Sequence, residues 1–110
     1  MVLGTLGEVF SQLRLLELGI QAAPPIKDSG NDLIAIKGEV VKYIQVKTSA
    51  TKIERVNNLP GIYHLVFLVE FESDESGIKY DDSKIWVINK DESVSEKKEL
   101  TQELVDSIWQ

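Results

Sequence analysis

Asp32, Gln45 and Lys47 are the side chains in this 110-residue sequence whose types and spacing best suit chemistry. Asp32 opens one run of β-branched residues, and Gln45 and Lys47 stand two residues apart at the end of a second run. The chain has no cysteine and a single histidine, His64, so it lacks the thiolates and multiple histidines of zinc sites. Any metal would therefore be held by oxygen, which favours Mg²⁺, Mn²⁺ or Ca²⁺.

The two runs flank Gly38-Glu39 and together predict a β-hairpin. An even-length loop centred there pairs Asp32 with Gln45 and directs both of them, together with Lys47, to one face. An odd-length loop shifts the register by one residue and sends Asp32 and Gln45 to opposite faces. The constellation therefore depends on the register.

The remaining elements must position this hairpin. We expect a helix over 5–18, a short strand over 20–23, a loop with one or two helical turns over 49–59, a central strand over 63–71 and an acidic loop over 72–83. A strand over 84–89 and a helix over 101–109, with Thr101 as its N-cap, should follow. The apolar stripe of the first helix should lie on the sheet, and it consists of Leu6, Val9, Phe10, Leu13 and Leu16. The length predicts a single domain over 1–110.

The formal net charge of −6 argues against tight binding of nucleic acid, but the charge is unevenly distributed. The segment 27–55 carries six basic and four acidic residues, whereas the chain from Glu70 onward carries twelve acidic residues and five lysines. The apolar N-terminus is interrupted by charges and follows a helical stripe, so we expect neither a signal peptide nor a membrane span. The absence of cysteine is compatible with a cytoplasmic location.

The order of these elements resembles the PD-(D/E)XK nuclease superfamily. The resemblance covers 5–89 and rests on a helix with a glutamate, on Asn31-Asp32-Leu33-Ile34-Ala35-Ile36 and on Ile44-Gln45-Val46-Lys47. Within the superfamily, these segments look most like Holliday-junction resolvases and small restriction-endonuclease-like families. Asn31 stands where the family name has proline, and Gln45 stands where the pattern usually has Glu or Asp, which removes one charge from the site.

The resemblance implies a role for each candidate residue. Asp32, the Gln45 side-chain oxygen, the Val46 main-chain carbonyl and Glu8 would hold Mg²⁺ or Mn²⁺. Lys47 would orient and deprotonate the attacking water and offset charge on the phosphoryl oxygens. Lys52 and Arg55 are candidates for contacts with a phosphate backbone.

Each of these residues also has a purely structural interpretation. Asp32 can satisfy backbone N–H groups of a turn after Gly30, and Gln45 and Lys47 can be solvated strand residues. Glu8 can close a capping box with Thr5, an explanation that needs no catalysis.

The resemblance implies a restriction-endonuclease-like α/β fold, with a mixed central sheet flanked by helices. It further implies a metal-dependent endonuclease acting on DNA, either resolvase-like or restriction-like. So short a chain would gain selectivity from a homodimer or a partner protein, with Trp109 and its neighbours as a possible contact. The alternative is a non-catalytic domain of the same fold that binds protein or nucleic acid.

Overall fold

The structure is a computed structural model that describes residues 3–26, 32–56 and 61–110. The elements are α1 (Leu3–Glu17), β1 (Gln21–Ala23), β2 (Leu33–Lys37), β3 (Val40–Ser49), β4 (Leu65–Asp74), β5 (Gly77–Asn89), the short 3₁₀ helix η1 (Val94–Glu96), β6 (Lys98–Glu99) and α2 (Gln102–Ile108). None of the helices in these ranges is long and apolar enough to cross a membrane.

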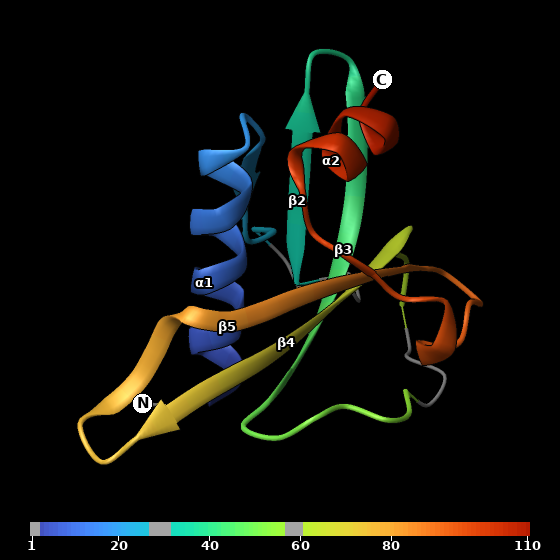
Figure 1. The fold of residues 1–110 in the computed structure, drawn as a ribbon. Helices are drawn as coiled ribbons and strands as arrows, with labels where there is room; N and C mark the ends of the chain where they lie inside the picture. The colour runs from blue at the N-terminus through green and yellow to red at the C-terminus, as the bar shows by residue number, and fades with distance from the viewer. Residues whose placement is uncertain (1–2, 27–31, 57–60) are drawn as a thin grey trace.

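The six strands form one mixed sheet whose spatial order follows the chain, β1-β2-β3-β4-β5-β6. The pair β3 and β4 is parallel, and the other four neighbouring pairs are antiparallel. Figure 1 shows β2 and β3 rising steeply while β4 and β5 cross them obliquely, so the sheet is strongly twisted. The expected α/β fold with a mixed central sheet and flanking helices is confirmed.

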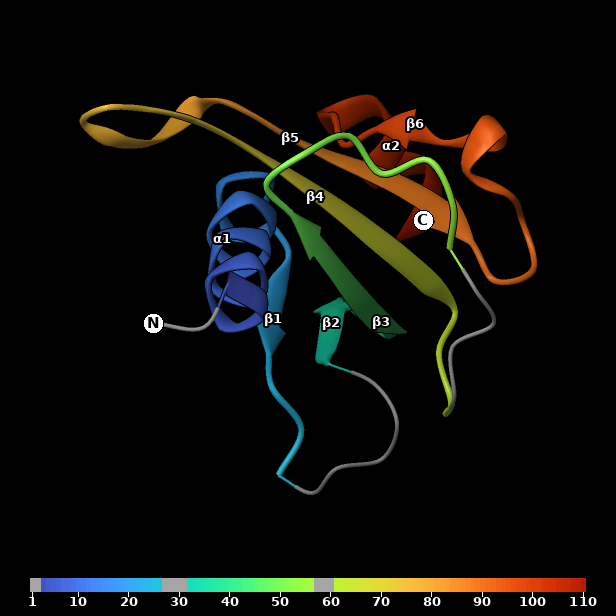
Figure 2. The same cartoon turned by 90° about the horizontal axis from the view of Figure 1, so that it is seen from below.

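Both helices contribute to the hydrophobic cluster on one face of the sheet. Phe10 and Leu15 of α1 join Val105 of α2 and the adjoining Trp109 in this cluster. A second cluster forms on the other face around Ile53, Tyr63, Val66, Leu68 and Ile88. No helix joins this second cluster among the described residues apart from η1, through Val94. Figure 2 shows the chain after β3 passing across β4 and β5, where it covers this face.

The face of α1 that packs on the sheet differs from the expected stripe. The buried residues of α1 are Gly7, Phe10, Ser11 and Leu15, whereas Val9, Leu13 and Leu16 are 53%, 54% and 64% exposed. The physical reason is the close approach of α1 to β3: a Cβ atom at Gly7 would overlap the Thr48 side chain. Only small residues fit there, and the Ser11 hydroxyl turns back to donate to the Gly7 carbonyl at 2.8 Å.

The expected acidic loop over 72–83 is wrong. β4 continues to Asp74 and β5 begins at Gly77, so this segment forms a long hairpin, visible as the projecting arm in Figure 1. Gly77 has a φ of 119°, which favours glycine, and Asp74 accepts hydrogen bonds from the Ser76 N–H and hydroxyl. Acidic composition concealed the hairpin.

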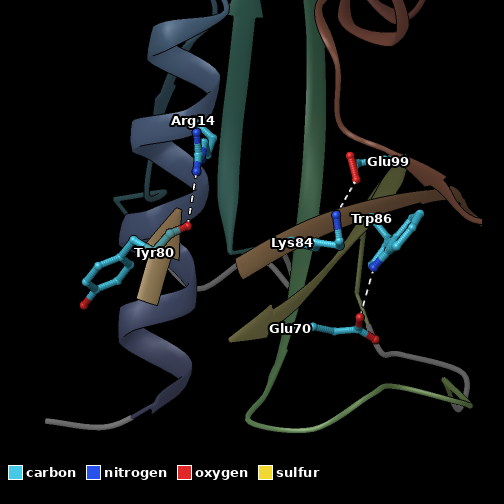
Figure 3. Close-up of polar contacts among 6 residues, drawn as sticks. All are labelled: Arg14, Glu70, Tyr80, Lys84, Trp86 and Glu99. Carbon is cyan, nitrogen blue, oxygen red and sulfur yellow. Dashed lines mark hydrogen bonds and ion pairs between the residues drawn. The ribbon is translucent and has the colours of Figure 1, made fainter. Parts of the chain in front are cut away.

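Tyr80 holds the arm against the body of the protein. Its ring packs against Phe10 and Phe71. Its backbone carbonyl accepts a hydrogen bond from Arg14 at 3.3 Å, which is drawn in Figure 3. The register shifts between Glu70 and Glu72.

Two further expectations are corrected near the ends of elements. β3 runs to Ser49, and no helical turn follows it over 50–56; the rest of that expected turn lies outside the described residues. Trp109 is only 3% exposed, and its indole N–H donates to the Ala35 carbonyl at 3.1 Å, so it packs in the core and offers no dimer contact. Thr101 caps α2 as expected by accepting from the Leu104 N–H at 3.2 Å.

The contact of Gly7 with Thr48 can be tested by a substitution that helix propensity alone would favour. Alanine forms helices better than glycine by about 1 kcal/mol, yet we expect Gly7→Ala to lower the free energy of unfolding by about 1–3 kcal/mol because of overpacking. Urea denaturation measures the change. Gly4→Ala is the matched control, since nothing lies within 4 Å of its added Cβ and it should be neutral or stabilising.

Combining Gly7→Ala with Thr48→Ala should recover much of the loss, because Thr48→Ala removes the Oγ1 and Cγ2 atoms and leaves only the Cβ atom in close contact. A Gly7→Ala protein as stable as Gly4→Ala would contradict the close approach.

Candidate functional site at the open end of the hairpin

The register of the β2–β3 hairpin is the even one. Leu33 lies opposite Ile44, and Lys37 lies opposite Val40 across the turn. Gly38 has a φ of 60°, as the first central position of a type II′ turn requires. The expected pairing is therefore confirmed, and it places Asp32, one residue before β2, beside Gln45.

The Asp32 carboxylate lies where β2 ends and β3 continues. Its Oδ2 atom accepts a hydrogen bond from the Val46 N–H at 2.7 Å, and its own N–H donates to the Ile44 carbonyl at 2.9 Å. The carboxylate thus takes the place of the next strand residue as partner for β3. Because backbone N–H groups of a strand point along the sheet, the carboxylate lies in the gap beyond β2, beside Val46.

Gln45 and Lys47 flank Val46 on β3 and share the face opposite α1. In the parallel register, Gln45 lies beside Val66 and Lys47 lies beside Leu68, both residues of the second cluster. Gln45 is half-buried and Lys47 is exposed. No ion pair joins Lys47 to a carboxylate among the described residues.

Glu8 reaches the same gap from the helix side. Burial, and then the negative charge of Asp32, raise the pKa of the Glu8 carboxyl above its ordinary value of 4.5. The second cause requires the two carboxylates to be close enough to repel. The capping-box interpretation of Glu8 is wrong, because α1 begins at Leu3 and Thr5 lies inside the helix.

The groups that border the gap are the Asp32 carboxylate and the Val46 backbone, with Glu8 on the side of α1 and the Gln45 side chain on the opposite face of the sheet. Within the described ranges, no group of three or more His, Cys, Asp or Glu side chains could hold a metal ion. A cation here would depend on the Asp32 and Glu8 pair with neutral oxygens and water, the kind of partial set with which Mg²⁺ is usually held. A cation would also relieve the repulsion that raises the pKa of Glu8.

Two residues that support the site escaped sequence reasoning. Gly7 allows α1 to approach β3 and so brings Glu8 near Asp32; a glycine inside a helical pattern was the available signal. Glu70 accepts hydrogen bonds from the Ile53 N–H at 2.7 Å and from the Trp86 indole at 3.0 Å. The sequence signal for Glu70 was a charged residue near the end of the most hydrophobic run of the chain, 63–71.

His64, to which no catalytic role was assigned, has a structural one. Its Nδ1 accepts from the Tyr43 N–H at 2.9 Å, and its own N–H donates to the Tyr43 carbonyl at 2.8 Å. These two bonds join the chain before β4 to β3, next to the Gln45 position.

No protein-family model matches the chain, and no curated protein matches it. Among solved structures, a bacterial homing endonuclease is similar over 90% of this chain and 76% of its own, with 17% sequence identity and a TM-score of 0.48. A TM-score at this level does not by itself establish a shared fold, so functional reasoning depends on the residues of this chain.

The partial burial of Glu8, together with the nearby charge of Asp32, predicts a pH-dependent cost to stability. Folding raises the pKa of Glu8, so stability falls as the pH rises from 4.5 through the folded value, and the full cost is present at neutral pH. We therefore expect Glu8→Gln, measured by thermal unfolding in EDTA, to be more stable than the wild type at pH 7. The gain should vanish below about pH 4.

Glu39→Gln, at the exposed hairpin turn, makes the same charge change and serves as control. The gain from Glu8→Gln should also shrink in an Asp32→Asn background. Equal behaviour of Glu8→Gln and Glu39→Gln across the pH range would show that the carboxylates are far apart.

Proposed function

We propose that this chain is a metal-dependent endonuclease that hydrolyses phosphodiester bonds in DNA, with a site of the PD-(D/E)XK kind. The observation that carries the proposal is the position of the Asp32 carboxylate. It accepts a hydrogen bond from the N–H of Val46, the residue between Gln45 and Lys47, and its negative charge contributes to the raised pKa of Glu8. The hydrogen bond links Asp32 to β3, and the effect of its charge links it to Glu8 of α1, which supports a site built from these three segments.

Asp32, Glu8, the Gln45 side-chain oxygen and the Val46 carbonyl are the proposed ligands of Mg²⁺ or Mn²⁺. When bound, the cation would polarise the scissile phosphate and make a water more acidic. The N–H of Val46 fixes one oxygen of Asp32, and a carboxylate retains lone pairs for a further partner. Asp32 can therefore accept the hydrogen bond from the Val46 backbone, a purely structural role, and also serve as a metal ligand.

Lys47 is the proposed catalytic lysine. It shares a strand face with Gln45, and it makes no ion pair with another described residue, so its ammonium is available to a phosphate. There it would orient the attacking water, assist its deprotonation and offset charge on the phosphoryl oxygens.

We further propose that selectivity, whether resolvase-like or restriction-like, comes from a second copy of the chain or from a partner protein. A 110-residue chain that supplies a sheet, two helices and a site has little surface left for specific recognition. A two-fold dimer would present two sites to the two strands of DNA. The side chain of Trp109 is buried, so a contact at this end of the chain would have to use its neighbours.

A second candidate function is a non-catalytic module that binds DNA or protein. Two observations favour it: Gln45 supplies no charge, and the chain as a whole is acidic, with a formal net charge of −6. The two candidates differ in their response to divalent cations.

Cleavage of supercoiled plasmid and of branched DNA with Mg²⁺ or Mn²⁺ tests the proposal. Asp32→Asn retains an acceptor oxygen for Val46 but loses the charge, and Lys47→Ala removes the ammonium; each should reduce cleavage at least about 100-fold. Lys98→Ala, which removes a lysine from β6, should cleave like the wild type. Cleavage that survives both substitutions would overturn this site, and absence of both cleavage and Mn²⁺ binding by calorimetry would favour the module.

Gln45→Glu tests the one departure from the usual motif. A third carboxylate beside Asp32 and Glu8 should strengthen Mn²⁺ binding about tenfold, a difference of about 1.4 kcal/mol, and should raise the cleavage rate at limiting metal. Calorimetry with Mn²⁺ measures the first effect, and Gln12→Glu on α1 controls for the added charge. Unchanged metal affinity in Gln45→Glu would remove residue 45 from the ligand set.

A further inference from the structure

Among the described residues, the basic side chains without an ion pair or an aromatic contact are concentrated in one segment. Arg14, Lys37, Lys79 and Lys84 form ion pairs, and Lys90 and Lys97 lie over aromatic rings. The described basic residues without such a contact are Lys42, Lys47, Lys52, Arg55 and Lys98. All but Lys98 lie within 42–56, a stretch that contains a single acidic residue, Glu54.

The second half of this segment, 49–56, has a fixed path although it is neither helix nor strand after Ser49. The Thr51 N–H donates to the Ser49 hydroxyl at 3.0 Å, and the Ile53 N–H donates to Glu70 at 2.7 Å. The Ile53 side chain is only 5% exposed and packs in the second cluster with residues of β4 and β5. Lys52 and Arg55 are exposed on either side of this anchor.

Glu70 is the residue that ties this loop to the sheet. One carboxylate oxygen accepts from Ile53, and the other accepts from the Trp86 indole at 3.0 Å, the bond drawn in Figure 3. Glu70 lies beside Ser49 in the parallel register, two positions along β4 from Leu68, the neighbour of Lys47. The loop is therefore anchored on the same face as Lys47, next to the strand that carries the candidate site.

We propose that Lys47, Lys52 and Arg55 form a track for the phosphate backbone of duplex DNA, and that Glu70 is the positioning residue that holds the loop carrying Lys52 and Arg55. This proposal rests on the proposed endonuclease function and identifies the surface that carries the substrate past the site. Most of the other described basic side chains pair with carboxylates or lie over aromatic rings, which leaves this face as the attractive one for a polyanion.

Binding of a labelled DNA duplex in EDTA, measured by fluorescence anisotropy over a range of salt concentrations, tests the track without cleavage. Lys52→Ala/Arg55→Ala should weaken binding about tenfold and reduce the slope of log affinity against log salt by about 2, because about 0.9 is lost per phosphate contact. Lys98→Ala is the control: it removes an unneutralised lysine outside the track and should have no effect on binding or slope.

Glu70→Gln distinguishes the anchoring of the loop by Glu70 from the effect of its negative charge on DNA binding. Removing a negative charge should by itself tighten DNA binding, but a glutamine has one acceptor oxygen for two donors, so the loop loses an anchor. We expect weaker binding and a smaller salt slope, with the fold verified by urea denaturation. Should Glu70→Gln unfold, the Lys52→Ala/Arg55→Ala variant still tests the track, since both of its substituted side chains are exposed and their loss should leave the fold intact.

The outcomes distinguish this proposal from the endonuclease itself. A wild type that cleaves DNA, with a Lys52→Ala/Arg55→Ala variant that binds like Lys98→Ala, would overturn the track and leave the endonuclease in place. Tighter binding by a folded Glu70→Gln would overturn the anchoring role. Binding that is lost as expected by a protein that never cleaves would support the track and overturn the catalytic function.

Discussion

The pairing of β2 with β3 is the interaction on which the rest of the candidate site depends. A two-residue turn with Gly38 at a positive φ fixes an even register. This register places Asp32 where the pairing with β2 ends and β3 continues beyond it. The bond from the Val46 N–H to Asp32 then completes the ladder with a side chain in place of a strand. A slip of one residue would send the charged and apolar side chains of the hairpin to the wrong faces.

A second constraint is the close approach of α1 to β3. Gly7 leaves room for Thr48, whose hydroxyl oxygen is buried and has no hydrogen-bond partner among the described residues. This arrangement leaves a buried polar group unsatisfied and turns Val9, Leu13 and Leu16 away from the core. It also brings Glu8 so close to Asp32 that the charge of Asp32 raises the pKa of Glu8. Departures from ideal packing of this sort are typical of functional sites.

The charged side chains are unevenly distributed over the molecule, which the formal net charge of −6 does not reveal. In the β4–β5 arm and in β6, acidic residues face lysines, as in the pairs of Asp74 with Lys79 and of Glu99 with Lys84; the second pair is drawn in Figure 3. Along β3 and the loop after it, the lysines have no such partners among the described residues. The local field at the candidate site is therefore less negative than the composition indicates, and it is the local field that a phosphate would meet.

The sequence by itself determined the hairpin, the central apolar strand and the N-terminal cap of α2, because these features follow from alternation and turn chemistry among neighbouring residues. It left an even and an odd register open for the hairpin, and the turn at Gly38 decided between them. It misjudged the face of α1, because that face depends on Thr48, far along the chain. Acidic composition concealed the 72–83 hairpin, and the core position of Trp109 depends on its distant partner Ala35. Residue types indicated Asp32, Gln45, Lys47 and Glu8 as candidates. Only the tertiary structure excluded the capping-box interpretation of Glu8, by placing Thr5 inside α1. Only the tertiary structure brought Glu8 near Asp32, because a helix reaches the end of a strand through its packing on the sheet.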